Sequence, residues 1–132
     1  MKILAFLLVV GVLVYAIAQT PLPDPLPSVN GPVPEITKEE RFQANVIAVR
    51  RIKAATTNPD SFTLQYVMDT DEALCVTYRT TNALNETVPG RAVVYDGEIV
   101  SSEMDRNRLG GRWNDRCAKK VGVNVTHIRD AL

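Results

Sequence analysis

Residues 58–78 constrain the fold more than any other part of the sequence. The pair Asn58-Pro59 ends a preceding helix, because the residue before a proline is driven out of the α region. Apolar side chains then recur at every second position, which is the period of a half-buried strand. These are Phe62, Leu64, Tyr66 and Met68. The alternation returns at 74–78 after an acidic turn at 69–72, so the stretch predicts a helix end followed by a β-hairpin.

A helix is expected before this hairpin, from about Lys38 to about Thr56. It opens with the pattern of a capping box, in which the side chains of Thr37 and Glu40 each accept from the other residue's amide. Apolar residues then recur at spacings of four, three and three, which gives one stripe that can pack on the hairpin. The stripe consists of Phe42, Val46, Val49 and Ile52.

Two more strands are expected after the hairpin. A long polar turn at 79–90 leads to an apolar strand at 91–95. The pair Asp96-Gly97 is a strong signal for a two-residue hairpin loop, and it predicts a fourth strand at 98–101.

The remaining part is expected to be a polar connector through Gly110-Gly111, then a short helix at 112–119. Valines alternate in the tail at 121–125, which indicates a last short strand. The predicted fold class is α+β, with the N-terminal helix packed on a four-stranded antiparallel meander and a short C-terminal helix.

The N-terminal residues are expected to lie outside the folded domain. A positive start, an uncharged apolar stretch and the small-residue site Ala16-Ile17-Ala18 predict a secretory signal peptide at 1–18. The apolar stretch is shorter than the roughly 20 residues of a bilayer span, which favours cleavage over an uncleaved anchor. A proline-rich linker at 19–35 follows, either as a spacer or as a polyproline ligand for a partner. The domain is then 36–132, secreted or periplasmic.

Cys75 and Cys117 both lie in the part expected to be exported. An even pair of cysteines in a small domain of an oxidising compartment predicts a disulfide bond. The only histidine, His127, lies in the tail, where it is a poor base for a catalytic thiol.

Metal, cofactor and catalytic sites are not expected. The acidic turn at 69–72 and the segment 105–107 each resemble the start of a calcium loop. The first has Leu74 in place of the required glycine, and the second has Arg116 in place of the bidentate glutamate. Solvated turns account for both segments.

Charge is distributed unevenly along a chain whose net charge is zero. Residues 60–105 hold two basic and nine acidic residues, and residues 106–132 hold seven basic and two acidic ones. The basic end combines arginine with the single tryptophan, a composition typical of an interface or an anion site. The candidate interaction residues are Arg106, Arg108, Arg112, Trp113 and Arg116.

Two interpretations of these candidate residues stay open. In one, the arginines contact an acidic partner, or a second copy through its acidic turn. In the other, Trp113 packs inward beside the disulfide while the arginines are solvated or pair with the acidic strands of the same chain.

The order of elements resembles a loosely defined group of small exported bacterial domains. The matching residues are Pro59-Asp60-Ser61-Phe62 at the helix end, Cys75 in a strand, and Asn82 and Gly90 in the following loop. The resemblance covers about 52–95 and departs from the group where Val88-Pro89-Gly90 replaces a double glycine. It implies the fold and export, and no activity.

The sequence therefore predicts a small exported domain that is not an enzyme and that binds a protein or has a structural role in or outside the cell envelope. The alternative is a small secreted hydrolase or enzyme inhibitor acting through the basic surface at Arg106–Arg116. A zero net charge gives no reason to expect nucleic acid as a partner, and stable membrane insertion after signal cleavage is not expected.

Overall fold

The computed structural model describes residues 35–132, so the predicted signal peptide and the predicted linker up to Pro34 lie outside the described residues. The elements follow in this order: α2 (Lys38–Ala54), η1 (Pro59–Ser61), β1 (Thr63–Asp69), β2 (Leu74–Thr81), β3 (Thr87–Tyr95), β4 (Glu98–Ser101), α3 (Arg106–Arg116), β5 (Val123–Asn124) and η2 (Thr126–Ala131). Within 35–132, no helix has both the length and the apolar character that a membrane crossing needs.

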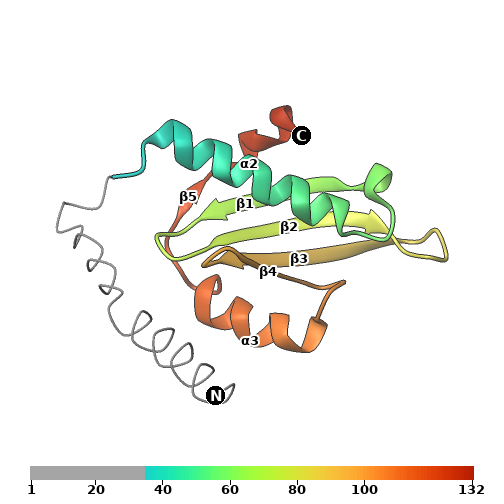
Figure 1. The fold of residues 1–132 in the computed structure, drawn as a ribbon. Helices are drawn as coiled ribbons and strands as arrows, with labels where there is room; N and C mark the ends of the chain where they lie inside the picture. Colours follow the sequence, from blue (N-terminus) through green and yellow to red (C-terminus); the bar gives the residue numbers. More distant parts are fainter. Residues whose placement is uncertain (1–34) are drawn as a thin grey trace, which may run out of the picture. The chain divides into compact units, whose positions relative to one another are not determined.

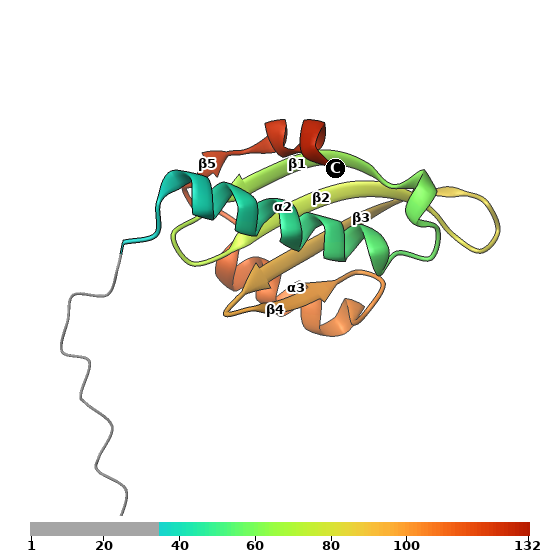
Figure 2. The same cartoon turned by 45° about the horizontal axis from the view of Figure 1, so that its top comes forward.

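The five strands form one antiparallel sheet in the order β4-β3-β2-β1-β5. Helix α2 and the C-terminal η2 lie on one face of this sheet, and α3 lies on the other (Figures 1 and 2). The predicted α+β class is confirmed, with one addition to the predicted four-stranded meander. The tail strand indicated by the alternating valines is β5, and it pairs with the end of β1.

Helix α2 begins with the predicted capping box. The Glu40 amide donates to Thr37 Oγ1 at 3.2 Å, and the Thr37 amide donates to Glu40 Oε2 at 2.8 Å. The helix ends at Ala54, two residues before the expected end, because the chain must turn into η1 at Asn58-Pro59.

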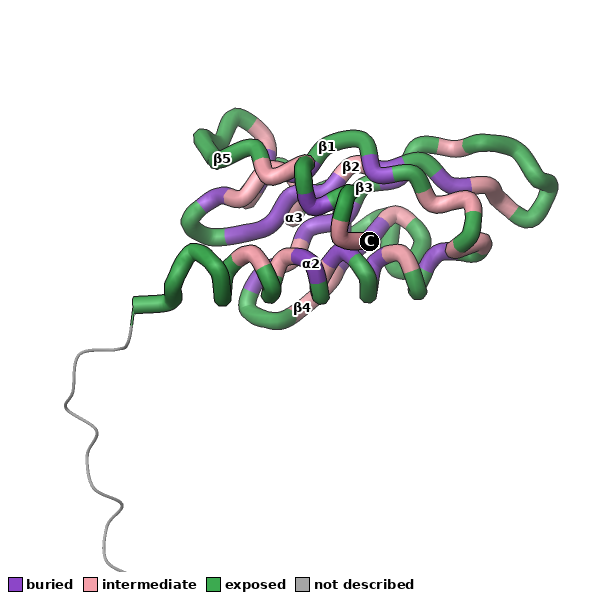
Figure 3. The backbone as a smooth tube through the Cα atoms, turned by 90° about the horizontal axis from the view of Figure 1, so that it is seen from above, coloured by how far each residue is buried: buried purple, intermediate pink, exposed green. Residues whose placement is uncertain are grey.

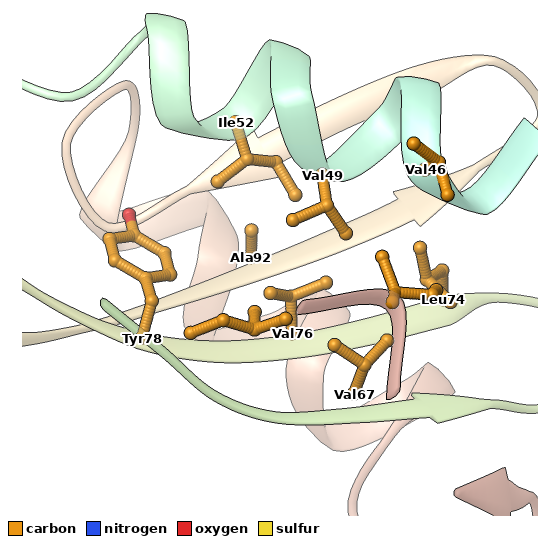
Figure 4. Close-up of a cluster of buried hydrophobic side chains, with 10 residues drawn as sticks. Val46, Val49, Ile52, Val67, Leu74, Val76, Tyr78 and Ala92 are labelled. Carbon is orange, nitrogen blue, oxygen red and sulfur yellow. The ribbon is translucent and has the colours of Figure 1, made fainter. Parts of the chain in front are cut away.

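The apolar stripe of α2 packs on the upper face of the sheet and forms the larger core cluster (Figure 4). Val46, Val49 and Ile52 point from the helix toward β1, β2 and β3. The other buried members are Leu64, Val67, Leu74, Val76, Tyr78, Ala92 and Ile128.

Strand β1 contains a β-bulge that the sequence alternation does not show. Leu64 pairs with Tyr78 while Tyr66 pairs with Thr77, so Gln65 is the extra residue. A bulge shifts every later side chain to the opposite face. Val67 is therefore fully buried and Tyr66 is 41% exposed, which reverses the faces expected for these two residues.

The predicted long turn at 79–90 is wrong, because both strands of this hairpin continue through most of it. The loop is confined to 82–86, where Asn82 Oδ1 accepts from the amides of Leu84 and Glu86 at 2.9 Å each. Thr80 is buried although polar, since its hydroxyl lies 3.1 Å from Ser61 Oγ of η1. A hydrogen bond between the hydroxyl groups of Thr80 and Ser61 of η1 thus allows a polar residue to lie within β2.

The predicted polar connector through Gly110-Gly111 is also wrong, because both glycines lie inside α3. Asp105 caps this helix by accepting from the Arg108 amide at 3.0 Å. A strong cap and burial of Leu109 favour the helix, and together they outweigh the roughly 1 kcal/mol that each helical glycine costs. The helix ends at Arg116, three residues before the expected end.

A smaller core cluster lies between α3 and the lower face of the sheet, and it contains the predicted disulfide. Cys75 of β2 is bonded to Cys117, the residue after α3. Val93, Val100 and Leu109 are buried around the bond. Strand β2 therefore has a core on each face, and Figure 3 shows buried residues along the central strands of the sheet.

The C-terminal segment covers the outer edge of β1. Val67 N donates to Thr126 Oγ1 at 3.0 Å, and the Val125 amide donates to Val67 O at 3.0 Å. Arg129 Nη2 donates to Leu64 O at 2.8 Å. Ile128 is fully buried in the larger core, so this segment is part of the fold.

Asp69 joins the start of α2 to the end of β1, and it is not the solvated turn residue expected from the sequence. Its carboxylate accepts from Arg41 at 2.7 and 2.8 Å and from Asn45 at 2.8 Å, and its side chain is only 10% exposed. Burial alone would raise the pKa of Asp69. The hydrogen bonds from Arg41 and Asn45, with the Arg41 charge, outweigh burial and hold this pKa below its ordinary value.

Replacing Asp69 by Asn is expected to lower the free energy of unfolding by about 1–3 kcal/mol at neutral pH, because Arg41 loses its anion. A carboxyl whose pKa is lowered by folding stabilises the protein above its unfolded pKa of about 3.9 and loses this contribution as pH falls through the folded value. Urea titrations across pH should therefore show the difference shrinking below about pH 4. Asp71→Asn, at an exposed neighbour, is the control. A difference that persists in strong acid would contradict the ionic role of Asp69.

Candidate functional site

The structure divides the predicted arginine cluster. Arg108 Nη1 lies 2.6 Å from Glu98 Oε1, and Arg116 Nη1 lies 3.0 Å from Glu72 Oε2. The guanidinium groups of Arg112 and Arg116 also lie over the ring of Tyr95, at 5.0 and 5.3 Å from its centroid. Three of the four arginines therefore have partners on the strands and turns beside α3.

Glu98 is the centre of the contacts at this end of β4. The Tyr95 hydroxyl donates to Glu98 Oε2 at 2.8 Å, and this bond, followed by the contact with Arg108, lowers the pKa of Glu98. The carboxylate thus stays charged and paired.

Trp113 is half-buried and packs on the smaller core cluster, which contains Cys117. The guanidinium of Arg91 lies over its ring at 5.1 Å from the centroid. Trp113 therefore helps to hold α3 against the sheet and also fixes an arginine that comes from β3.

Arg106 is separated from the other arginines of α3 and lines a different surface. Helix α3 lies under β3 and β4, and the β2–β3 hairpin reaches beyond it (Figure 1). An open concavity of about 600 Å³ lies in this part of the molecule, and we call it the basic concavity. It is lined by Gln65, Thr77, Tyr78, Arg79, Val88, Pro89, Gly90, Arg91, Ser102, Arg106 and Leu109.

Three arginines meet in the basic concavity: Arg79 from β2, Arg91 from β3 and Arg106 from α3. None of the described residues that line it is acidic, and the ion pairs found among residues 35–132 involve none of these three. Arg79 and Arg91 are also the only two basic residues of the acidic stretch 60–105. Three arginines that are far apart in the sequence therefore lie on one surface of the structure.

Sequence reasoning identified Arg106 and missed Arg79 and Arg91. The strand register could have indicated that Arg79 and Arg91 are neighbours. Arg91 pairs with Thr77, and Arg79 lies two residues after Thr77, so both arginines are on the same face of the sheet. Finding it requires the correct strand ends, and the predicted long turn placed Arg79 outside the sheet.

The position of Arg106 is unfavourable for the helix itself. It is the first residue of α3, whose first turn holds no acidic residue, and a cation is disfavoured at the positive end of a helix dipole. The Asp105 carboxylate that caps the helix offsets part of this cost. Among residues 35–132 Arg106 forms no ion pair, so its guanidinium group is available to a ligand.

The bulge in β1 also contributes to the basic concavity. Gln65 is the extra residue of the bulge, and it is one of the lining residues. Bulges often redirect a side chain beside a binding site.

The acidic turn, a candidate contact for a second copy, is largely engaged by arginines of the same chain. Asp69 pairs with Arg41, and Glu72 pairs with Arg116. Among residues 35–132, no group of three His, Cys, Asp or Glu side chains is placed to hold a metal ion.

Comparisons with known proteins add no relative to this description. No protein-family model matches the sequence, and no curated protein and no solved structure matches it either.

Proposed function

We propose that this is an exported, non-catalytic binding domain that holds an anionic partner in the basic concavity. The observation that carries the proposal is the convergence of Arg79, Arg91 and Arg106 on one open surface whose described lining residues include no carboxylate. Guanidinium groups bind carboxylate or phosphate groups readily, often through two parallel hydrogen bonds.

Binding is favoured over catalysis by the residue types of the basic concavity. Its described lining residues include no carboxylate, imidazole or thiol that could act as an acid, a base or a nucleophile. The hydroxyl of Ser102 is engaged in the fold, since it accepts from the Arg91 amide at 2.7 Å. A secreted hydrolase would therefore need a different site. An enzyme inhibitor would not, because it could bind the acidic surface of its target enzyme through the same arginines.

Export is supported by the Cys75–Cys117 disulfide, because such bonds persist in oxidising compartments and are rare in reducing ones. The predicted signal peptide at 1–18 agrees with this location. A domain outside the cytoplasm that has a basic surface fits a role in the envelope or beyond the cell.

The proposal is tested by reversing two of the three charges in the variant Arg79→Glu/Arg106→Glu. Wild type is expected to bind poly-L-glutamate or dextran sulfate at low salt, and the variant is expected to bind either polymer at least about tenfold more weakly. Fluorescence of Trp113, the only tryptophan, is the readout, because Arg91 lies over its ring. Added salt should weaken binding by wild type.

A matched control is Lys38→Glu/Arg51→Glu, which makes the same change in net charge on exposed positions of α2. Like Arg106, Lys38 is the first residue of its helix, so Lys38→Glu and Arg106→Glu each put an acid at a helix N-terminus, where it is favourable. Arg51→Glu puts an acid in the last turn of α2, which costs about 0.3–1 kcal/mol at an exposed position. Arg79 is exposed, so both variants should fold. Equal loss of binding in the two variants, or no binding of either polymer by wild type, would overturn the proposed function.

A further inference from the structure

We propose that the anion held in the basic concavity is an acidic protein segment in which carboxylates flank an aliphatic side chain. This inference rests on the proposed function and names the class of partner. It follows from what lines the basic concavity besides the three arginines.

The basic concavity offers no free aromatic face. The ring of Trp113 is covered by Arg91 on one side and packs on the smaller core cluster. Tyr78 is the only aromatic residue of the lining, and it is 1% exposed. Its ring stacks on Phe62, with centroids 5.0 Å apart, and so belongs to the larger core. Sugars and nucleic-acid bases commonly bind by stacking on such faces, so a glycan or a single-stranded nucleic acid would lack this contact.

Aliphatic surface lies among the arginines instead. Pro89 of β3 and Leu109 of α3 line the same concavity, and Pro89 lies on the same face of the sheet as Arg91, two residues along the strand. Pro89 is exposed and is therefore accessible to a ligand. A bare inorganic anion would leave this apolar surface in water, whereas an aliphatic side chain between two carboxylates would cover it.

The geometry of Arg91 suits a carboxylate. Stacking on Trp113 restricts the guanidinium before any ligand arrives, so less conformational entropy is lost on binding. The planar fork of a guanidinium matches the two oxygens of a carboxylate. Glutamate and aspartate side chains therefore suit this arginine.

The test measures how tightly three probes bind the full domain, by calorimetry and by Trp113 fluorescence. The probes are a hexapeptide of alternating glutamate and leucine, the same peptide with glutamine in place of glutamate, and a sulfated oligosaccharide of similar charge. The acidic peptide is expected to bind at least about tenfold more tightly than the glutamine peptide. Arg79→Glu/Arg106→Glu should remove this difference, and Lys38→Glu/Arg51→Glu should keep it.

A second variant tests the aliphatic contact independently of charge. Pro89→Ser is expected to reduce the preference for the leucine peptide over an alternating glutamate–alanine peptide by about threefold or more. Because Pro89 is exposed, near the tip of the hairpin, this variant should fold.

The possible outcomes separate this inference from the proposed function. Binding of the sulfated oligosaccharide alone, through the same arginines, would overturn the peptide inference and leave the proposed function standing. Tight binding of the acidic peptide that the Arg79→Glu/Arg106→Glu variant retains would overturn the peptide inference at this site. Absence of binding to every polyanion would overturn both.

Discussion

Removal of the disulfide by the double replacement Cys75→Ala/Cys117→Ala is expected to lower the free energy of unfolding by about 2–5 kcal/mol. The bond joins residues 42 positions apart, so it restricts a large part of the unfolded chain. The loop-entropy relation gives about 4 kcal/mol for a loop of this length. In the folded state the bond also ties the end of α3 to the central strand β2, and both cysteines are buried.

Guanidinium denaturation of the double variant and of wild type gives the difference directly. Wild type unfolded in the presence of a reducing agent is the control, and its stability should fall toward that of the double variant. Alanine is preferred to serine because a buried hydroxyl without a partner would add its own cost. A loss below about 1 kcal/mol would mean that α3 is held by packing alone and that the bond contributes little.

Replacement of Gly90 by alanine is expected to lower the free energy of unfolding by about 3 kcal/mol. A Cβ at this position would lie 2.3 Å from Cε2 and 2.4 Å from Cζ of Tyr78, the residue that pairs with Gly90 across β2 and β3. The ring cannot move aside easily, because it is 1% exposed and stacks on Phe62. Overpacking of a rigid site costs typically about 1–3 kcal/mol and occasionally more.

Gly110 provides the matched control, because a Cβ there meets no atom within 4 Å. Gly110→Ala lies inside α3, so it is expected to raise stability by up to about 1 kcal/mol. The loss in the double variant Gly90→Ala/Tyr78→Leu should be smaller than the sum of the two single losses if the collision with the ring is the cause. Similar small effects at both glycines in thermal melts would show that the hairpin adapts to the added methyl group.

The parts of the fold that the sequence predicts correctly depend on signals within a few residues. The capping box needs only Thr37 and Glu40, and the tight β3–β4 hairpin needs only Asp96-Gly97. The misjudged parts depend on distant contacts. Thr80 is polar and turn-like by itself, and it lies in a strand because Ser61 is placed to bond with it.

The candidate site was only partly predictable for the same reason. The arginines of α3 are neighbours in sequence, but the fold gives Arg108 and Arg116 their own carboxylates on β4 and in the acidic turn. Arg79 and Arg91 join Arg106 only through the register of β2 and β3. Local composition locates the basic end of the chain, and strand pairing decides which arginines form no ion pair among residues 35–132.

The C-terminal cover of β1 has a consequence for the order of folding. The Val67 amide and its partner Thr126 are 59 residues apart, and Leu64 O and Arg129 are 65 apart. During synthesis, β1 emerges well before the residues that cover it, and an uncovered strand edge can pair with another chain. The domain therefore reaches a state protected from strand-to-strand aggregation only after these late residues have docked.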